Sequence, residues 1–143
     1  MPPDAATDER LTELALAAMS FARLLGLEVL AGSGPDEVRA RIAWRDDLCT
    51  TGGVVHGGAL MALADSAGAV CAFLNLPEDA ATATIESKTN FFASVSRGHV
   101  HACSRPLHRG RTTVVVETDL RDDDGRHVAR VTQTQAVLTP RPA

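Results

Sequence analysis

One apolar segment, residues 59–74, constrains the fold of this 143-residue chain more than any other feature. Nearly every position in it is apolar, so a helix here would have no polar face and would have to be buried on all sides. We expect that helix to cover about residues 57–76 and to end before Pro77, because proline cannot continue it. The segment is interrupted by Asp65 and Ser66 and is too short to cross a bilayer comfortably.

Strand-like segments make up most of the rest of the chain. Before the helix, residues 27–31 and 37–44 are predicted to be two strands joined by a glycine-rich turn. The second of them alternates, with Val38, Ala40 and Ile42 on one face and mostly charged residues on the other. After the helix, strands are expected over residues 83–92, 99–108, 112–121 and 127–138.

The N-terminal part of the chain predicts one more helix. Apolar residues recur at helical spacing between Thr7, a candidate cap, and Gly26, a candidate stop. Residues 1–6 are expected to be a loose leader and residues 139–143 a tail. Residues 46–53 are small and polar, which is typical of a loop.

The order of these elements predicts the architecture. An antiparallel sheet without a second sheet needs another element to cover its apolar face, and the apolar helix is able to do so. We therefore expect an α+β hotdog fold, in which a curled antiparallel sheet of five to six strands wraps around one long buried helix, with an extra N-terminal helix. With no repeat and no linker, residues 1–143 are expected to form one domain. One edge strand would stay unpaired, which favours dimerisation by sheet extension.

Asp65 is the most unusual residue of the apolar helix, because burying a carboxylate costs free energy unless it is hydrogen-bonded or faces a cavity. A structural interpretation is that it bonds to a neighbouring backbone or loop. A functional interpretation is that it faces a pocket, where a carboxylate can activate water or attack a carbonyl carbon. We favour the functional interpretation.

The triplet His56, Gly57 and Gly58 stands where this helix begins. The first N–H groups of a helix lack partners inside it and carry partial positive charge, so they can hold a thioester carbonyl oxygen as charge develops on it. Gly57 and Asp65 are eight residues apart, about 12 Å along a helix. Both cannot touch one thioester within a single chain, so a site that uses both needs two subunits.

Residues 56–65, together with the downstream segments 88–92, 109–113 and 124–126, resemble the PaaI-type hotdog thioesterases, and within them the Arthrobacter-type 4-hydroxybenzoyl-CoA thioesterases. The resemblance covers about residues 20–140. It implies hydrolysis of an aromatic or medium-chain acyl-CoA to the free acid and CoA, with no cofactor beyond the CoA of the substrate. It also implies a homotetramer, a dimer of dimers with each site at a subunit interface.

The resemblance implies roles for individual residues. Asp65 would be the nucleophile or general base, the Gly57 N–H would polarise the thioester carbonyl, and His56 would shape the helix entry. Many relatives carry Asn or Gln where this chain has Thr50, whose shorter hydroxyl would then orient the water or the substrate. The remaining candidate contacts to substrate and CoA are Gly58, Ser66, Asn90, Arg109, Gly110, Arg111, Thr112, Thr113 and Arg141.

The expected phosphate contacts are the main departure from this pattern. An Arg-Pro pair follows the two phenylalanines in Arthrobacter-type relatives, whereas this chain has Ala93 and Ser94. The turn at residues 109–113 and the tail residue Arg141 are therefore the best candidates for the CoA phosphates. The alternative interpretation is a solvated hairpin and a frayed terminus.

Composition excludes several other classes of protein. The net charge of −4 and the low aromatic content of 3%, with no tyrosine, argue against a nucleic-acid partner. Three irregularly spaced cysteines suit a reducing compartment, and the N-terminus lacks the basic start of a secretory signal. We therefore expect a cytoplasmic protein without a membrane or nucleic-acid partner.

The sequence also offers other candidate sites and two alternative functions. His99 and His101 share a strand face, but no carboxylate or cysteine stands at a suggestive spacing, so no metal site is expected. Cys71 follows the apolar pattern without a nearby activator, which favours core packing. The alternative functions are a non-catalytic acyl-CoA-binding hotdog protein and a hotdog enoyl-CoA hydratase. Such hydratases usually pair their acid with a histidine, and no histidine follows Asp65 on the helix.

Overall fold

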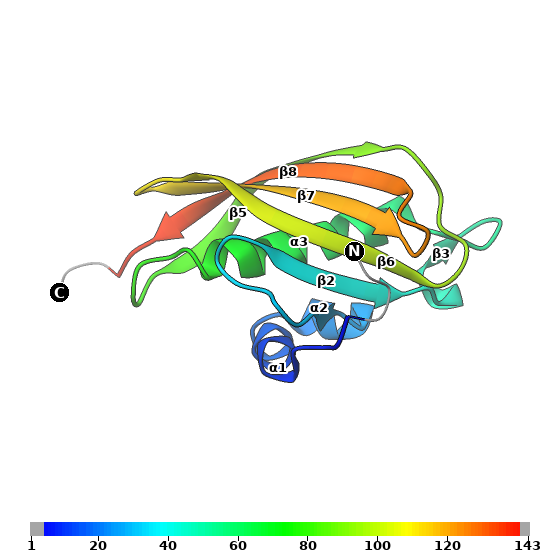
Figure 1. Cartoon of the computed structure of the whole chain (residues 1–143). Helices are drawn as coiled ribbons and strands as arrows, with labels where there is room; N and C mark the ends of the chain where they lie inside the picture. Colours follow the sequence, from blue (N-terminus) through cyan, green and yellow to red (C-terminus); the bar gives the residue numbers. More distant parts are fainter. Residues whose placement is uncertain (1–4, 141–143) are drawn as a thin grey trace.

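The computed structural model describes residues 5–140 and confirms the α+β hotdog architecture (Figure 1). Six strands form one antiparallel sheet in the order β1-β2-β6-β7-β8-β5. Their bounds are Glu28–Val29 (β1), Val38–Ala43 (β2), Ala81–Phe91 (β5), His99–Arg109 (β6), Thr113–Asp122 (β7) and His127–Leu138 (β8). The strands predicted after the central helix are all present, because alternation and turn residues are local signals.

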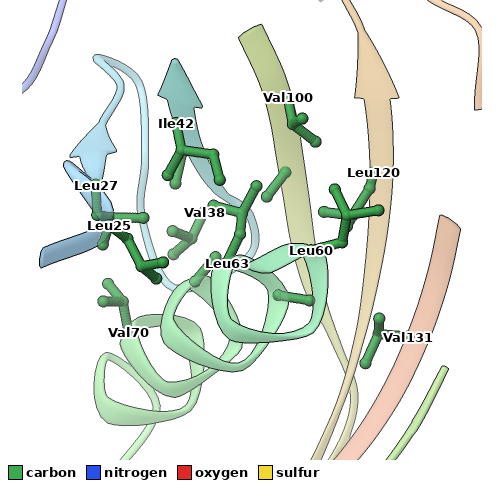
Figure 2. Packing of buried hydrophobic residues seen from close by; sticks show 14 of the residues in the cluster. Leu25, Leu27, Val38, Ile42, Leu60, Leu63, Val70, Val100, Leu120 and Val131 are labelled. Atoms are coloured by element: carbon green, nitrogen blue, oxygen red, sulfur yellow. The ribbon is translucent and has the colours of Figure 1, made fainter. Parts of the chain in front are cut away.

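The central helix, α3 (Gly57–Phe73), packs against the sheet and contacts β2, β5, β6, β7 and β8. Figure 2 shows Leu60 and Leu63 between the helix and core residues of the sheet such as Val38, Val100 and Leu120. Each of these side chains is at most 3% exposed. Burying a side chain of this size contributes about 1.5–3 kcal/mol, so the sheet and the helix stabilise each other.

The N-terminal segment differs from the prediction of one helix. It forms two, α1 (Glu9–Ala18) and α2 (Ser20–Leu25), because Met19 between them has an extended backbone. The predicted cap, Thr7, is also wrong: Asp8 is the N-cap, and its Oδ1 accepts the Leu11 N–H at 2.9 Å. Asp is a strong N-cap because its short side chain reaches an unpaired N–H of the first turn.

Two segments that were expected to be irregular are partly ordered by backbone hydrogen bonds. Ala6, assigned to a loose leader, accepts the Ala31 N–H at 2.7 Å. The expected loop before α3 contains a 3₁₀ turn, Asp46–Leu48, and a small hairpin of β3 (Cys49–Thr50) and β4 (Val54–Val55). This hairpin leads directly into α3. Within residues 5–140, no helix is both long enough and apolar enough to span a membrane.

In the part of the chain that the structure describes, the edge strand β5 has a single neighbour, β8. A bulge between Thr84 and Glu86 shifts their register, so that Thr84 lies opposite Gln135 and Ser87 lies opposite Gln133. Bulges re-aim side chains by changing which residues face each side of a sheet. Here the bulge lets Thr84 and Ser87 both pair with residues of β8 that point toward α3.

Candidate active site

The start of α3 presents one free backbone donor. His56 is the N-cap, and its Nδ1 accepts the Gly58 N–H at 2.8 Å. The His56 N–H is itself held by the Leu48 carbonyl at 2.9 Å, which fixes the helix entry to the preceding turn. The Gly57 N–H meets no acceptor within residues 5–140. It therefore combines an available proton with the positive end of the helix dipole.

The ring of Phe91 flanks this donor. A Cβ placed on Gly57 would stand 3.2 Å from Phe91 Cζ, so the ring lies almost on the glycine backbone. Phe91 ends the edge strand β5 and is half exposed, as is Phe92 next to it. An acyl group that approaches the Gly57 N–H would meet this apolar surface. Sequence reasoning used the two phenylalanines only for the family resemblance.

Asp65 lies two turns further along α3 and is half-buried. Its Oδ1 accepts the Thr84 hydroxyl at 3.0 Å and the Gln133 amide at 3.3 Å, and the same amide reaches the Asp65 carbonyl at 3.4 Å. No donor among residues 5–140 reaches its Oδ2. The carboxylate is thus anchored to the sheet by one oxygen and open at the other.

A second glutamine continues the network behind Asp65. Gln135 donates to Thr84 Oγ1 at 2.8 Å and accepts from Thr82 Oγ1 at 3.0 Å. Sequence reasoning missed Thr84, Gln133 and Gln135. A signal was present: in β8 both glutamines share the face of Val131, so two polar residues interrupt an apolar alternation.

Thr50, Ser66 and Asn90 make no hydrogen bond to the Asp65 carboxylate within residues 5–140. Thr50 is exposed on β3, in the hairpin that precedes α3. Ser66 is buried, at 6% exposure, and so faces the interior. Asn90 is exposed near the end of β5 and accepts a bond from Lys88. These three roles stay predictions.

The turn at residues 109–113 lies at the other end of α3. Arg109 donates to Asn75 just after the helix, at 2.6 Å, and pairs with Asp36. A phosphate would have to compete with these partners. Arg111 and Thr112 are exposed. Gly110 is required by the turn, because a Cβ there would lie 2.9 Å from a backbone oxygen. Arg141 lies outside the described residues.

His99 and His101 stand next to a carboxylate, which corrects the expectation that none would be near. Asp123, from the turn after β7, accepts the His99 backbone N–H at 3.1 Å and bonds to His101 Nε2 at 2.7 Å. The three potential ligand atoms lie within 4.8 Å of one another. A metal on His101 Nε2 would leave the proton on Nδ1, which is buried and has no partner within residues 5–140. We therefore assign the trio to anchoring the turn.

The charge of Asp123 fits that structural role. Burial alone would raise the pKa of its carboxyl, but the hydrogen bonds from His101 and the His99 backbone outweigh burial and lower it. A cavity of about 340 Å³ lies beside this turn and is lined by Val95, Ser96, Arg97, Asp122, Asp123, Asp124 and Arg126. It includes none of the predicted substrate contacts.

Comparison with known proteins indicates thioester hydrolysis. The family model "Thioesterase superfamily" matches residues 52–129. The Mycobacterium tuberculosis protein Rv1847 is 37% identical over 100 residues, which are 68% of this chain and 71% of the relative. The 1,4-dihydroxy-2-naphthoyl-CoA hydrolase of Escherichia coli is 31% identical over 86 residues, 60% of this chain and 63% of the relative.

Solved structures agree with the sequence matches. The structure of Rv1847 superposes with a TM-score of 0.81 at 34% identity and covers 87% of this chain and 100% of that chain. The thioesterase HI1161 of Haemophilus influenzae gives a TM-score of 0.85 at 26% identity, covering 96% and 94%. With the family match over more than half of its length, this chain belongs to the thioesterase superfamily and is a thioester hydrolase.

Proposed function

We propose that the chain is an acyl-CoA thioesterase whose active site combines Asp65 of one protomer with the α3 start of another. The observation that carries this proposal is the Gly57 N–H, which has no acceptor within residues 5–140, on the helix that also holds an anchored carboxylate. The N–H is suited to a developing oxyanion and the carboxylate to the attack. Their separation of about 12 Å along α3 is the reason for two protomers.

The proposed reaction begins when the thioester carbonyl oxygen accepts the Gly57 N–H of one protomer. Asp65 of the other protomer either attacks the carbonyl carbon, giving an anhydride that water opens, or takes a proton from the attacking water. In both routes the C–S bond breaks, CoA leaves as the thiol after protonation, and the acyl carbon gains the oxygen of water.

The proposed substrates are aromatic or medium-chain acyl-CoAs. The E. coli relative is named as a hydrolase of an aromatic acyl-CoA, 1,4-dihydroxy-2-naphthoyl-CoA. Phe91 beside Gly57 and the exposed Phe92 supply apolar surface for such a group. For contacts to the substrate and CoA we propose Gly58, Ser66, Asn90 and the turn at residues 109–113, with Arg141 in the tail. Thr50 is proposed to orient the water or the substrate. Arg109 would serve only if a phosphate replaced Asp36 as its partner.

A panel of aromatic and medium-chain acyl-CoAs, with thiol release followed by a colorimetric reagent, tests the proposal. We expect turnover of at least one of them and a loss of kcat on the order of 10³-fold or more in Asp65→Asn. Asp79→Asn is the matched control, because Asp79 has a φ of 61° and Asn tolerates that conformation. Full activity of Asp65→Asn would refute the assignment.

The same assay separates the alternatives. Acyl-CoA binding without turnover would instead indicate a non-catalytic binding protein. Hydration of an enoyl-CoA without thiol release would indicate a hydratase.

A further inference from the structure

Two buried glutamines stand behind Asp65 and have no part in the reaction described above. Gln133 and Gln135 are 0% and 1% exposed and point from β8 toward α3. A primary amide inside an apolar core costs free energy unless its hydrogen bonds are made. The Nε2 of each amide donates to Asp65 or to Thr84, which holds Asp65, whereas Gln133 Oε1 has no partner within residues 5–140.

The hydrogen bonds of Gln135 orient its side-chain amide. The Thr82 hydroxyl lies 3.0 Å from both Gln135 Oε1 and the Ala136 carbonyl oxygen, and Gln135 Nε2 donates to Thr84 Oγ1 at 2.8 Å. Thr84 therefore keeps its own proton for Asp65 Oδ1, 3.0 Å away. A reversed Gln135 amide would draw that proton away and leave two lone pairs facing each other. This series of hydrogen bonds thus presents the Thr84 hydroxyl as a donor to the Asp65 carboxylate.

Gln133 adds the second donor to Oδ1, at 3.3 Å. Its position depends on Gly68, one turn beyond Asp65, because a Cβ there would stand 2.4 Å from Gln133 Oε1. The glycine lets the amide lie directly on the helix. As a result Oδ1 is occupied by two donors, whereas Oδ2 receives none from residues 5–140.

We propose that Gln133 and Gln135 are positioning residues that fix Asp65 so that Oδ2 is the oxygen that attacks the thioester or activates water. This inference rests on the proposed function and names the reacting atom within it. A carboxylate held in one rotamer before the substrate arrives does not have to reorganise during the reaction. Neither glutamine has to touch the substrate for this effect.

A double-mutant cycle tests the positioning role of Gln135. Gln135→Leu and Thr84→Val should each lower kcat by about tenfold, with KM nearly unchanged, because each removes the oriented donor on Asp65. The double variant should be no slower than Thr84→Val, since Gln135 acts through Thr84. Thr84→Ser, which keeps the hydroxyl, should restore kcat. An unchanged kcat in Gln135→Leu, or losses of kcat that multiply in the double variant, would refute the positioning role of Gln135.

The positioning role of Gln133 is tested with its own variant and control. Gln133→Met removes the amide at similar volume and should lower kcat by about tenfold. Thr118→Val is the control, because Thr118 is fully buried and bonds to Ser104 at 2.7 Å without any bond to Asp65. It should lose stability and keep kcat. If it loses as much kcat as Gln133→Met, the effect is general loosening of the core, and the positioning role is wrong.

A crystal structure of Gln135→Leu gives a readout that does not depend on activity. Asp65 should occupy a second rotamer or several; a single unchanged rotamer would contradict the inference. If the glutamine variants do not fold, the Thr84→Val and Thr84→Ser pair still decides. A wild type that hydrolyses no thioester would refute the proposed function, whereas an active wild type with fully active glutamine variants would refute only the positioning role.

Discussion

At the scale of single residues, the start of α3 divides its donors between structure and substrate. His56 Nδ1 takes the Gly58 N–H, so that the Gly57 N–H alone is left for a carbonyl oxygen. A glycine also lets the ring of Phe91 approach closely. The same short segment thus caps the helix and presents the N–H that we propose as the oxyanion donor, so the two roles can be tested with separate variants.

Gly57→Pro removes that N–H with little strain. Proline is favoured at the first helical position, and His56 already has a ψ of 138°, which suits a residue before proline. We expect kcat to fall by about 10²–10³-fold, as for loss of one oxyanion donor. Gly57→Ala keeps the N–H and adds the same Cβ next to the ring of Phe91, so it should lose far less kcat. Equal losses in both variants would mean that shape, not the donor, is what matters.

Cys71 is expected to be inert. Burial raises the pKa of its thiol to about 11, against the opposing effect of Arg109. At pH 8 only about one thiol in a thousand is then ionised. We expect iodoacetamide at pH 8 to leave Cys71 unlabelled, as measured by mass spectrometry, and Cys71→Ala to keep the wild-type kcat. Inactivation that tracks labelling of Cys71 would contradict this.

At the scale of elements, cross-strand charges help to hold β7 to β8. Asp119 lies opposite Arg130 and accepts its Nε–H at 2.8 Å and a bond from His127 at 3.0 Å. Burial would raise the pKa of the Asp119 carboxyl, but the bonds and charges of Arg130 and His127 outweigh burial and lower it. Such a carboxyl stabilises the fold above its unfolded pKa and loses that effect as pH falls through its folded pKa.

Asp119→Asn should therefore cost about 1 kcal/mol of unfolding free energy at neutral pH. The difference from wild type should shrink as the pH falls below about 4 and both side chains become neutral. Urea unfolding between pH 7 and pH 3 measures it. Asp124→Asn is the control, because Asp124 is 76% exposed and, among residues 5–140, pairs with Arg97 alone. A difference that stays constant with pH would argue against the ion pair.

At the scale of the whole molecule, the open edge of β5 is where we expect a second subunit to bind. Among the described residues this strand pairs only with β8, and its Ile85 and Phe91 are 60% and 50% exposed. An exposed apolar edge favours pairing with another chain. Asp65 lies beside this edge, because Thr84 on β5 donates to its Oδ1. Assembly and catalysis are therefore expected to depend on the same strand.

Mixing two inactive variants tests the shared site. In a dimer of Asp65→Asn with Gly57→Pro, one of the two sites receives both mutations and the other receives none. Co-expressed chains with separate tags should therefore regain about half of the wild-type activity per mixed dimer, whereas each variant alone stays inactive. Sites built within single chains would show no recovery, and an active monomer in sedimentation would contradict the shared site directly.

Much of the fold could be predicted from the sequence, and the helix ends that were predicted wrongly are local errors. The split at Met19 and the cap at Asp8 were missed because several neighbouring residues could have ended or capped a helix of that composition. Asp123 was not expected beside His99 and His101, because it reaches them across 22 to 24 residues through the turn after β7.

By itself the sequence determined the buried helix, the strands around it and the eight-residue spacing of Gly57 and Asp65. These depend on periodicity and helix ends, which short stretches of chain encode. Only the tertiary structure decided what holds Asp65. Thr84 and Gln133 lie 19 and 68 residues from it and meet it because β5, with its bulge, and β8 pack side by side against α3. Contacts across such separations come from packing, which no local pattern specifies.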